Sequence, residues 1–119
     1  MPSIPTTPPT TATRRTALAL STEWVNSTIV RISASGEIDA SNTAELLDYV
    51  LRRGANCQSL ILDLRDVTFF GTAGFSALRT IDVRSSRASV KWMVVPGPVV
   101  SRVLKICDPC CELPRDVEA

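Results

Sequence analysis

The sequence contains no histidine and few aromatic residues, and these two absences exclude several functions. Without histidine the chain lacks the commonest general base and the commonest metal-binding side chain. Aromatic residues make up only 5% of the chain, which is too few for a platform that stacks nucleic-acid bases. The formal net charge is +1, so the chain lacks the basic character typical of nucleic-acid-binding proteins. We therefore expect no nucleic-acid partner, and no enzyme built on histidine.

The sequence also lacks long apolar runs and phosphate-binding loops. No run approaches the length of a membrane span, and no glycine-rich loop of the Walker or Rossmann type is present. The one candidate targeting segment, residues 14–20, has an apolar part too short for a signal sequence and continues into strand-like residues. We therefore expect a cytoplasmic protein that needs no cofactor and does not associate with a membrane.

Composition divides the chain into a tail and one domain. Residues 1–13 are rich in proline and threonine and offer almost nothing to bury, which predicts a disordered tail. The chain as a whole is 45% apolar, a value typical of soluble globular proteins. Residues 14–119 are therefore expected to form a single domain with its own core.

The first part of this domain reads as a hairpin followed by a helix. Residues 16–22 and 28–34 have strand-like patterns on either side of a turn at Asn26 and Ser27. A helix is expected to start near Ser41 or Asn42, because Asn42 and Glu45 have the spacing of a capping box. The same helix is expected to end at Gly54.

Strands and helices alternate in the rest of the domain. Residues 59–64 form an apolar run typical of a buried parallel strand, and residues 90–95 form another strand. A helix over residues 73–86 should lie between them, and a third helix should follow, with Pro98 in its first turn. The inward-facing residues of these two helices are expected to be Ala77, Leu78, Ile81, Val100, Val103, Leu104 and Cys107. Residues 111–113 are expected to form a short last strand. The pattern predicts an α/β fold, a mixed β-sheet with helices packed against it.

Several short motifs, taken in order, resemble a known family. Gly36-Glu37-Ile38-Asp39 before a helix resembles the Gly-Glu-Leu/Ile-Asp motif of STAS domains. Residues 62–69, followed by Gly71-Thr72-Ala73-Gly74-Phe75, resemble their central strand, loop and second helix, and residues 99–106 resemble their third helix. The resemblance implies a STAS-like domain over residues 14–119, with an N-terminal hairpin, parallel strands and a C-terminal helix that is short or absent.

The resemblance implies a binding protein rather than an enzyme. Stand-alone STAS domains are anti-sigma factor antagonists, which bind an anti-sigma factor with an ATPase-type kinase fold and so release a sigma factor. This chain would then regulate transcription as a monomer or weak dimer, without catalytic residues of its own. The expected partner-binding residues are Gly36, Glu37, Asp39, Asn42, Phe70, Gly71, Thr72, Ala73, Gly74, Ser76 and Arg79.

Thr72 is the candidate phosphoacceptor. Family members usually carry Asp-Ser-Ser-Gly or Asp-Ser-Thr-Gly here, whereas this chain has Gly71-Thr72-Ala73-Gly74, so Ala73 replaces the principal phosphorylated residue. Thr72 retains a hydroxyl one position earlier, at the expected start of a helix, where backbone N–H groups favour a phosphate. Its expected structural role is that of the helix N-cap, which contributes about 1 kcal/mol.

The four cysteines support a second interpretation. Cys107 and Cys110 have the spacing of thiol oxidoreductases, which place their motif at a helix N-terminus, but here the pair follows a helix. Together Cys57, Cys107, Cys110 and Cys111 are too unevenly spaced for a tetrahedral zinc site, so no metal is expected. The alternatives left open are a regulatory disulfide, a thiol-redox sensor or oxidoreductase that uses Cys107 and Cys110, and a scaffold subunit of a signalling assembly.

Overall fold

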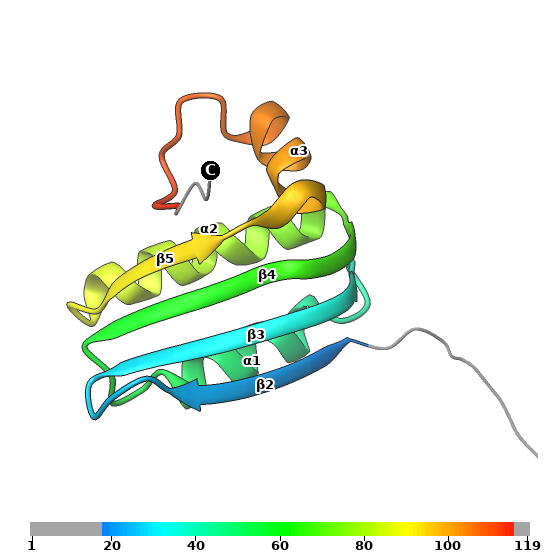
Figure 1. Cartoon of the computed structure of the whole chain (residues 1–119). Coiled ribbons are helices and arrows are strands. Elements are labelled where there is room, and N and C mark those ends of the chain that lie inside the picture. The colour runs from blue at the N-terminus through cyan, green and yellow to red at the C-terminus, as the bar shows by residue number, and fades with distance from the viewer. Residues whose placement is uncertain (1–17, 116–119) are drawn as a thin grey trace, which may run out of the picture.

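The computed structural model describes residues 18–115, which contain a four-stranded mixed sheet (Figure 1). The strand order is β2-β3-β4-β5. β2 (Ala19–Trp24) pairs antiparallel with β3 (Ile29–Ile38). β3, β4 (Ser59–Phe70) and β5 (Lys91–Val95) are parallel to one another. The hairpin and the parallel strands expected from the sequence are therefore confirmed.

Three helices complete the fold. α1 (Thr43–Arg53) and α2 (Thr72–Arg87) cover one face of the sheet, the far face in Figure 1. α3 (Gly97–Cys107) follows β5 and packs against β4. No helix within residues 18–115 is long and apolar enough to cross a bilayer. The expected tail over residues 1–13 lies outside the described residues.

The core lies between the sheet and the two helices that cover it. The buried residues of β3 follow the two-residue period of a strand, with the half-buried Gly36 as the exception: they are Val30, Ile32, Ala34 and Ile38. α1 contributes Leu46 and Val50, and α2 contributes the predicted Ala77, Leu78 and Ile81. Complete burial of one such aliphatic side chain stabilises the fold by about 1.5–3 kcal/mol, so this face of the sheet supplies most of the hydrophobic stabilisation.

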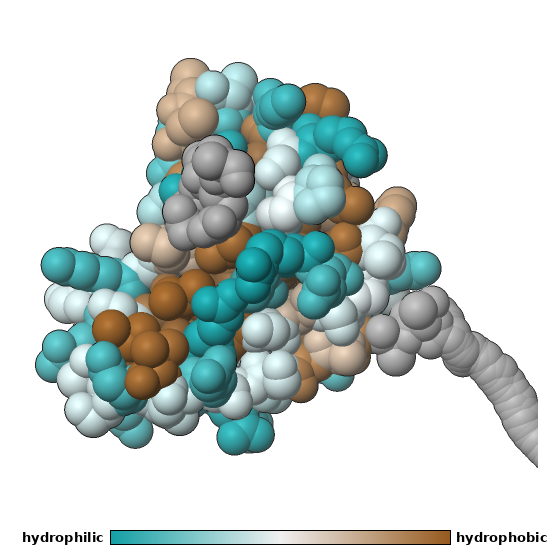
Figure 2. Space-filling view, viewed as in Figure 1, coloured by the Kyte–Doolittle hydropathy of each residue, from teal (hydrophilic) through white to brown (hydrophobic). Residues whose placement is uncertain are grey.

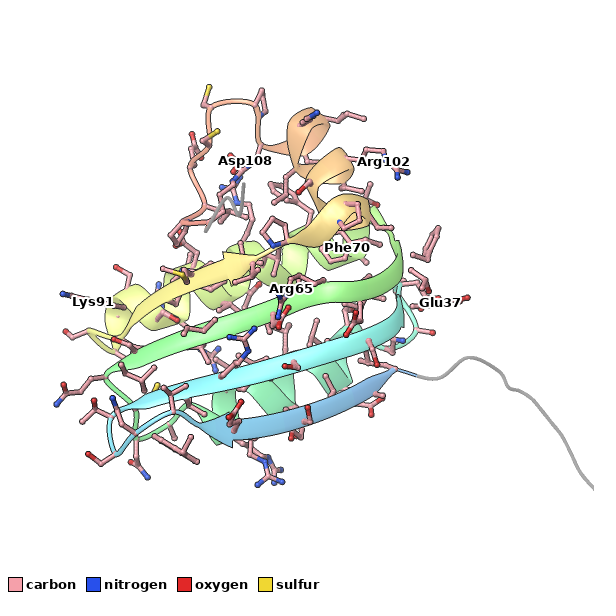
Figure 3. All side chains as sticks on the ribbon, viewed as in Figure 1. Glu37, Arg65, Phe70, Lys91, Arg102 and Asp108 are labelled. Carbon is pink, nitrogen blue, oxygen red and sulfur yellow. The ribbon has the colours of Figure 1, made fainter. Side chains whose placement is uncertain are left out.

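The other face of the sheet carries a small ion network at its centre. Arg31 and Arg65 both reach Asp63, with N–O distances of 2.5 and 2.9 Å (Figure 3 labels Arg65). Burial alone would raise the pKa of Asp63, but hydrogen bonds from Arg65 and Arg31 outweigh it and hold this pKa at about 2. Helices packed over this face would require apolar residues at its centre. Charged groups occupy these positions instead.

Two strands extend further than the sequence indicated. The predicted end of β4 at residue 64 is wrong, because the strand continues to Phe70. β3 likewise includes the Gly36-Glu37-Ile38 motif. The two extensions pair with each other, with Glu37 opposite Phe69 and Ile38 opposite Phe70. This pairing stabilises strand structure in a segment where exposed charged residues interrupt the apolar pattern.

The expected strand over residues 111–113 is also wrong. Cys111 has a positive φ of 55° and donates its N–H to the carbonyl oxygen of Asp108, so the chain turns here. The segment returns to the sheet at Pro114, whose carbonyl oxygen accepts the N–H of Val94 at 2.9 Å. An isolated bridge between Val94 and Arg115 is the only strand-like pairing of this segment within the described residues.

Asp108 holds this C-terminal segment in place. Its buried carboxylate accepts hydrogen bonds from the backbone N–H groups of Glu112 and Leu113 and forms an ion pair with Arg115. Burial raises the pKa of Asp108, but those backbone hydrogen bonds and the arginine reverse the effect, so the pKa is lowered overall. The ionised carboxylate is therefore part of the folded structure.

Candidate functional site

The carboxyl ends of β3 and β4 lie side by side and bring the two sequence motifs together. Gly71 donates its N–H to the carbonyl oxygen of Ile38 at 3.0 Å, which extends the ladder past the last residue of β4. Thr68 donates its hydroxyl to the carbonyl oxygen of Gly36 at 3.2 Å. Figure 3 shows Glu37 and Phe70 at this end of the molecule. Residues 36–42 and 70–74 thus lie next to each other, although Ile38, Phe70 and Gly74 within them are buried.

Asn42 holds the first of these two segments in shape. Its Oδ1 accepts the N–H of Asp39 at 3.0 Å, and its Nδ2 donates to the carbonyl oxygen of Glu37 at 2.8 Å. The predicted capping box with Glu45 is therefore wrong, because the Asn42 side chain makes no capping hydrogen bond to α1. The Asn42 amide instead pairs with backbone groups of the loop, the N–H of Asp39 and the carbonyl oxygen of Glu37. Asn42 is a positioning residue.

Asp39 organises the other side of the same loop. Its Oδ1 accepts both the N–H and the hydroxyl of Ser41, at 2.9 and 2.5 Å. Its carbonyl oxygen accepts the N–H groups of Asn42 and Thr43, each at 3.2 Å. The carboxylate thus lies at the start of α1, where the helix dipole favours negative charge. These local bonds fix the loop before any partner binds.

The second segment presents Thr72 to solvent. Gly71 is the N-cap of α2, with extended backbone angles, and Thr72 is the first helical residue and is exposed. The prediction that Thr72 is the N-cap is therefore wrong. The hydrogen-bond ladder with β3 continues through Gly71, so the N-cap of α2 lies one residue earlier than predicted. The Thr72 side chain makes no capping hydrogen bond. Its hydroxyl lies beside first-turn N–H groups that have no partner within the helix.

Gly74 permits the close packing that fixes this turn. A Cβ atom at Gly74 would lie 2.5 Å from Cε1 of Phe70, closer than real Cβ contacts. The buried ring of Phe70 occupies that space and anchors the start of α2 to the end of β4. Because the backbone on both sides of Thr72 is fixed, the direction of its Cα–Cβ bond is fixed as well.

The exposed face of α2 continues the surface. Thr72, Ser76 and Arg79 are all exposed, and their i, i+4, i+7 spacing places them on one side of the helix. The guanidinium of Arg79 lies 5.9 Å from the ring centroid of Phe75, which is half-buried. Ala73 is half-buried beside them. Of the predicted partner-binding residues on α2, Thr72, Ser76 and Arg79 are thus exposed on one face, whereas Gly74 is buried.

Sequence reasoning did not single out Phe69. This side chain is 50% exposed, and its ring lies 3.5 Å from the position that a Cβ of Gly71 would occupy. The alternation of a strand could have indicated it, because two successive phenylalanines in a strand point to opposite faces. The buried Phe70 requires an outward-facing Phe69.

The cysteines are not gathered at one place. Cys57 is buried in the turn between α1 and β4, donates to the carbonyl oxygen of Gly54, and has a pKa raised by burial. Cys107 is half-buried at the end of α3, and Cys110 and Cys111 are exposed in the segment that follows. All four are free thiols. In residues 18–115 no group of three or more ligand side chains is placed to hold a metal ion.

A mixed sheet with a hairpin first, parallel strands next and a loop pair at their carboxyl ends defines the SpoIIAA-like class of α/β domains. The family model described as STAS domain matches residues 23–114, and the chain belongs to this family. One curated relative is osmosensory protein A of Mycobacterium tuberculosis, which is 33% identical over 69 residues. That alignment covers 58% of this chain and 44% of the relative, so the chain matches less than half of the relative's length.

Solved structures share the same fold. An anti-sigma factor antagonist from Mycobacterium paratuberculosis superposes with a TM-score of 0.74 at 22% identity, covering 86% of this chain and 87% of that one. The anti-sigma factor antagonist SpoIIAA in its unphosphorylated form gives a TM-score of 0.66 at 16% identity, covering 84% and 90%. At these identities the likeness establishes the fold, and the function needs its own argument.

Proposed function

We propose that this protein is an anti-sigma factor antagonist, which acts in the cytoplasm and releases a sigma factor by binding its anti-sigma factor. The observation that carries the proposal is the exposed Thr72 hydroxyl at the first residue of α2, on a turn fixed by β3 and β4. The partner would be an anti-sigma factor with an ATPase-type kinase fold. It would contact residues 36–42, residues 70–74 and the exposed face of α2.

Phosphorylation of Thr72 would switch this binding off. The partner kinase would transfer the γ-phosphoryl group of its ATP to the Thr72 oxygen, and the hydroxyl proton would leave to a base on the kinase. The product carries about −1.5 to −2 charges at pH 7. Against a partner carboxylate at ~4 Å, each unit charge costs about 4 kcal/mol at an effective dielectric constant of 20. Because about 1.4 kcal/mol changes affinity tenfold, such a repulsion is sufficient to release the partner.

A phosphorylation assay tests this proposal. Wild-type protein, Thr72→Ala and Thr80→Ala are incubated with the ATPase-type anti-sigma factor of the same organism and labelled ATP. We expect label in wild type and in Thr80→Ala, and none in Thr72→Ala. Thr80 is a matched control, because this α2 threonine donates its hydroxyl to the carbonyl oxygen of Ser76 at 3.2 Å. Uptake by Thr72→Ala at the wild-type rate would exclude Thr72 as the acceptor.

The cysteines support a further regulatory input to the same binding. Cys107, Cys110 and Cys111 lie within five residues, and two of them are exposed. Glutathione disulfide could oxidise two of these thiols to a disulfide, with two molecules of glutathione formed in exchange. We expect the oxidised protein to bind the partner with altered affinity. Equal affinity of oxidised and reduced protein in the same binding assay would eliminate this input.

A further inference from the structure

An apolar groove lies between the end of β4 and α3, next to the Thr72 turn. It is lined by Phe69 and Phe70 of β4 and by Val99, Arg102, Val103 and Ile106 of α3, and its volume is about 350 Å³. We call it the α3 groove. In Figure 2 apolar (brown) atoms reach the surface beside α3, among hydrophilic ones. The volume lies at the lower end of the range of about 300–1,000 Å³ found for binding pockets.

α3 has more apolar surface than its own packing uses. Val100 and Leu104 are fully buried and attach the helix to the domain. Val99 and Val103 are half-buried, and Ile106, on the same side of the helix, is 81% exposed. A helix packed on one side of a domain needs one apolar stripe. The second stripe of α3 packs only partly against the core, through Val99 and Val103, and leaves Ile106 uncovered.

The unequal lengths of β4 and β5 open this space. β5 ends at Val95, opposite Asp63, so the last residues of β4 have no strand on that side. α3 begins there and presses onto β4. Gly97 has a φ of +71°, and a Cβ at this position would lie 2.6 Å from Cα of Arg65. The first turn of α3 thus approaches β4 closely, and the groove lies between the outer side of the helix and Phe69.

The charged residue among those that line the groove is a cation. Arg102 lines it and Lys105 is exposed on the same helix, and α3 contains no acidic residue. None of the ion pairs found within residues 18–115 involves either cation. Figure 3 shows Arg102 projecting away from the body of the protein. An apolar floor beside Arg102, with a second exposed cation on the same helix, complements a ligand that is apolar on one side and carries carboxylates next to it.

We infer that the α3 groove binds an amphipathic helix of the anti-sigma partner, with aliphatic residues on its buried face and flanking Asp or Glu side chains. This inference rests on the proposed function for the identity of the partner. The groove adjoins the proposed contact surface, because Phe69 lines it and also lies beside Gly71. Aliphatic residues at i, i+3, i+4 and i+7 of the bound helix would contact Phe69, Val103 and Ile106. Its carboxylates would pair with Arg102 and Lys105.

The test uses two synthetic helical peptides with leucines at i, i+3, i+4 and i+7 and either glutamates or lysines at the remaining surface positions. Each is titrated into ¹⁵N-labelled full-length protein, and backbone amide shifts are recorded. We expect the glutamate peptide to shift amides of residues 68–70 and 98–106 and to bind at least tenfold more tightly than the lysine peptide. Arg102→Glu should reverse this preference, and Ile106→Asp should weaken binding of the glutamate peptide at least tenfold.

The control variant is Arg87→Glu, which makes the same charge change at an exposed residue at the end of α2. It should bind the glutamate peptide within twofold of wild type. Equal binding of both peptides, shifts outside the groove, or no binding would overturn the inference. Tighter binding of laurate than of either peptide would also overturn it, because a single-chain amphiphile would then be the better occupant.

The same titration separates this inference from the proposed function. Thr72→Glu should bind the glutamate peptide as wild type does, because Thr72 does not line the groove. If the anti-sigma factor fails to bind while the glutamate peptide still occupies the groove, the proposed function is wrong and the groove stands as an acidic-helix site. If the anti-sigma factor binds while both peptides fail, the groove inference alone is wrong.

Discussion

The Thr72 turn and the cysteine segment over residues 107–111 lie at opposite ends of their helices. Thr72 is the first residue of α2, and Cys107 is the last residue of α3. A helix carries partial positive charge at its N-terminus and partial negative charge at its C-terminus. A phosphate at Thr72 would therefore be stabilised by the backbone, whereas a thiolate at Cys107 would not. This difference favours a phosphorylation switch over a thiol enzyme.

The two regions are also held in place by different interactions. A backbone hydrogen bond between β3 and Gly71 fixes the Thr72 turn, and the Asn42 amide fixes the loop beside it. The segment after α3 depends on one buried carboxylate, that of Asp108. Backbone ladders are insensitive to charge, but a buried carboxylate must stay ionised and paired. The Thr72 turn is therefore the more robust of the two regions.

The largest effect is expected when the Asp108 carboxylate is removed. Asp108→Ala leaves Arg115 as a buried cation without its partner and also frees two backbone N–H groups. We expect a loss of about 3–5 kcal/mol in the free energy of unfolding, measured by urea denaturation. Asp48→Ala is the control, because it breaks an exposed ion pair with Arg52 and should cost about 0.5 kcal/mol. Similar losses in both variants would show that Asp108 does not hold the segment.

Gly74→Ala should weaken the Thr72 turn directly. The added Cβ would lie 2.5 Å from the Phe70 ring, which is buried and cannot move freely. Overpacking of this kind costs about 1–3 kcal/mol, measurable in the same urea experiment. Gly71→Ala is the matched control, since the atom nearest to its added Cβ would be 3.5 Å away and the φ of Gly71 is −83°. A cost for Gly71→Ala as large as that for Gly74→Ala would contradict this account of the packing.

Asn42→Ala should loosen the loop beside Thr72. The variant loses the two hydrogen bonds to Asp39 and Glu37, and we expect about 1–2 kcal/mol of lost stability together with weaker partner binding. Asn26→Ala provides the comparison, because Asn26 accepts hydrogen bonds from Thr28 and Ile29 in the β2–β3 turn. It should lower stability but leave partner affinity unchanged. Equal effects of both variants on affinity would remove Asn42 from the site.

Acid should release the cysteine segment and spare the Thr72 turn. The pKa of Asp108 is lowered in the folded state, so its stabilisation is present above the ordinary carboxyl pKa and is lost as pH falls through the lowered value. Below about pH 4 we expect the amide signals of Glu112 and Leu113 to shift in NMR spectra before those of Gly71 and Thr72 do. Simultaneous shifts in both regions would indicate global unfolding instead. Asp108→Asn should remove this local pH dependence.

The sequence predicted those elements that a local period defines. The apolar spacing of Ala77, Leu78 and Ile81 placed α2, and the apolar run over residues 59–64 placed the first half of β4. The second half of β4 could not be read from the sequence, because Arg65 and Asp66 are exposed and interrupt the run. Pairing with β3 stabilises it instead. The C-terminal segment depends on a buried aspartate, which has no periodic signal.

The candidate site was predictable in outline and not in detail. The two motifs around Gly36 and Thr72 indicated a shared surface, and parallel β3 and β4 do place them together. Asn42 is the N-cap residue of α1, but the predicted capping box is wrong because its amide bonds to the loop instead. The predicted N-cap at Thr72 is wrong because the pairing with β3 extends to Gly71, which is the N-cap of α2. The α3 groove arises from the unequal lengths of β4 and β5, which the pairing of the strands determines.

Calorimetric titration of the ATPase-type anti-sigma factor with this protein tests the central claim most directly. The claim is that the exposed Thr72 hydroxyl lies at the centre of the partner-binding surface. We predict that wild type and Thr72→Ser bind with similar Kd and that Thr72→Glu binds at least tenfold more weakly, a difference of about 1.4 kcal/mol or more. A Kd for Thr72→Glu equal to that of wild type would contradict the claim.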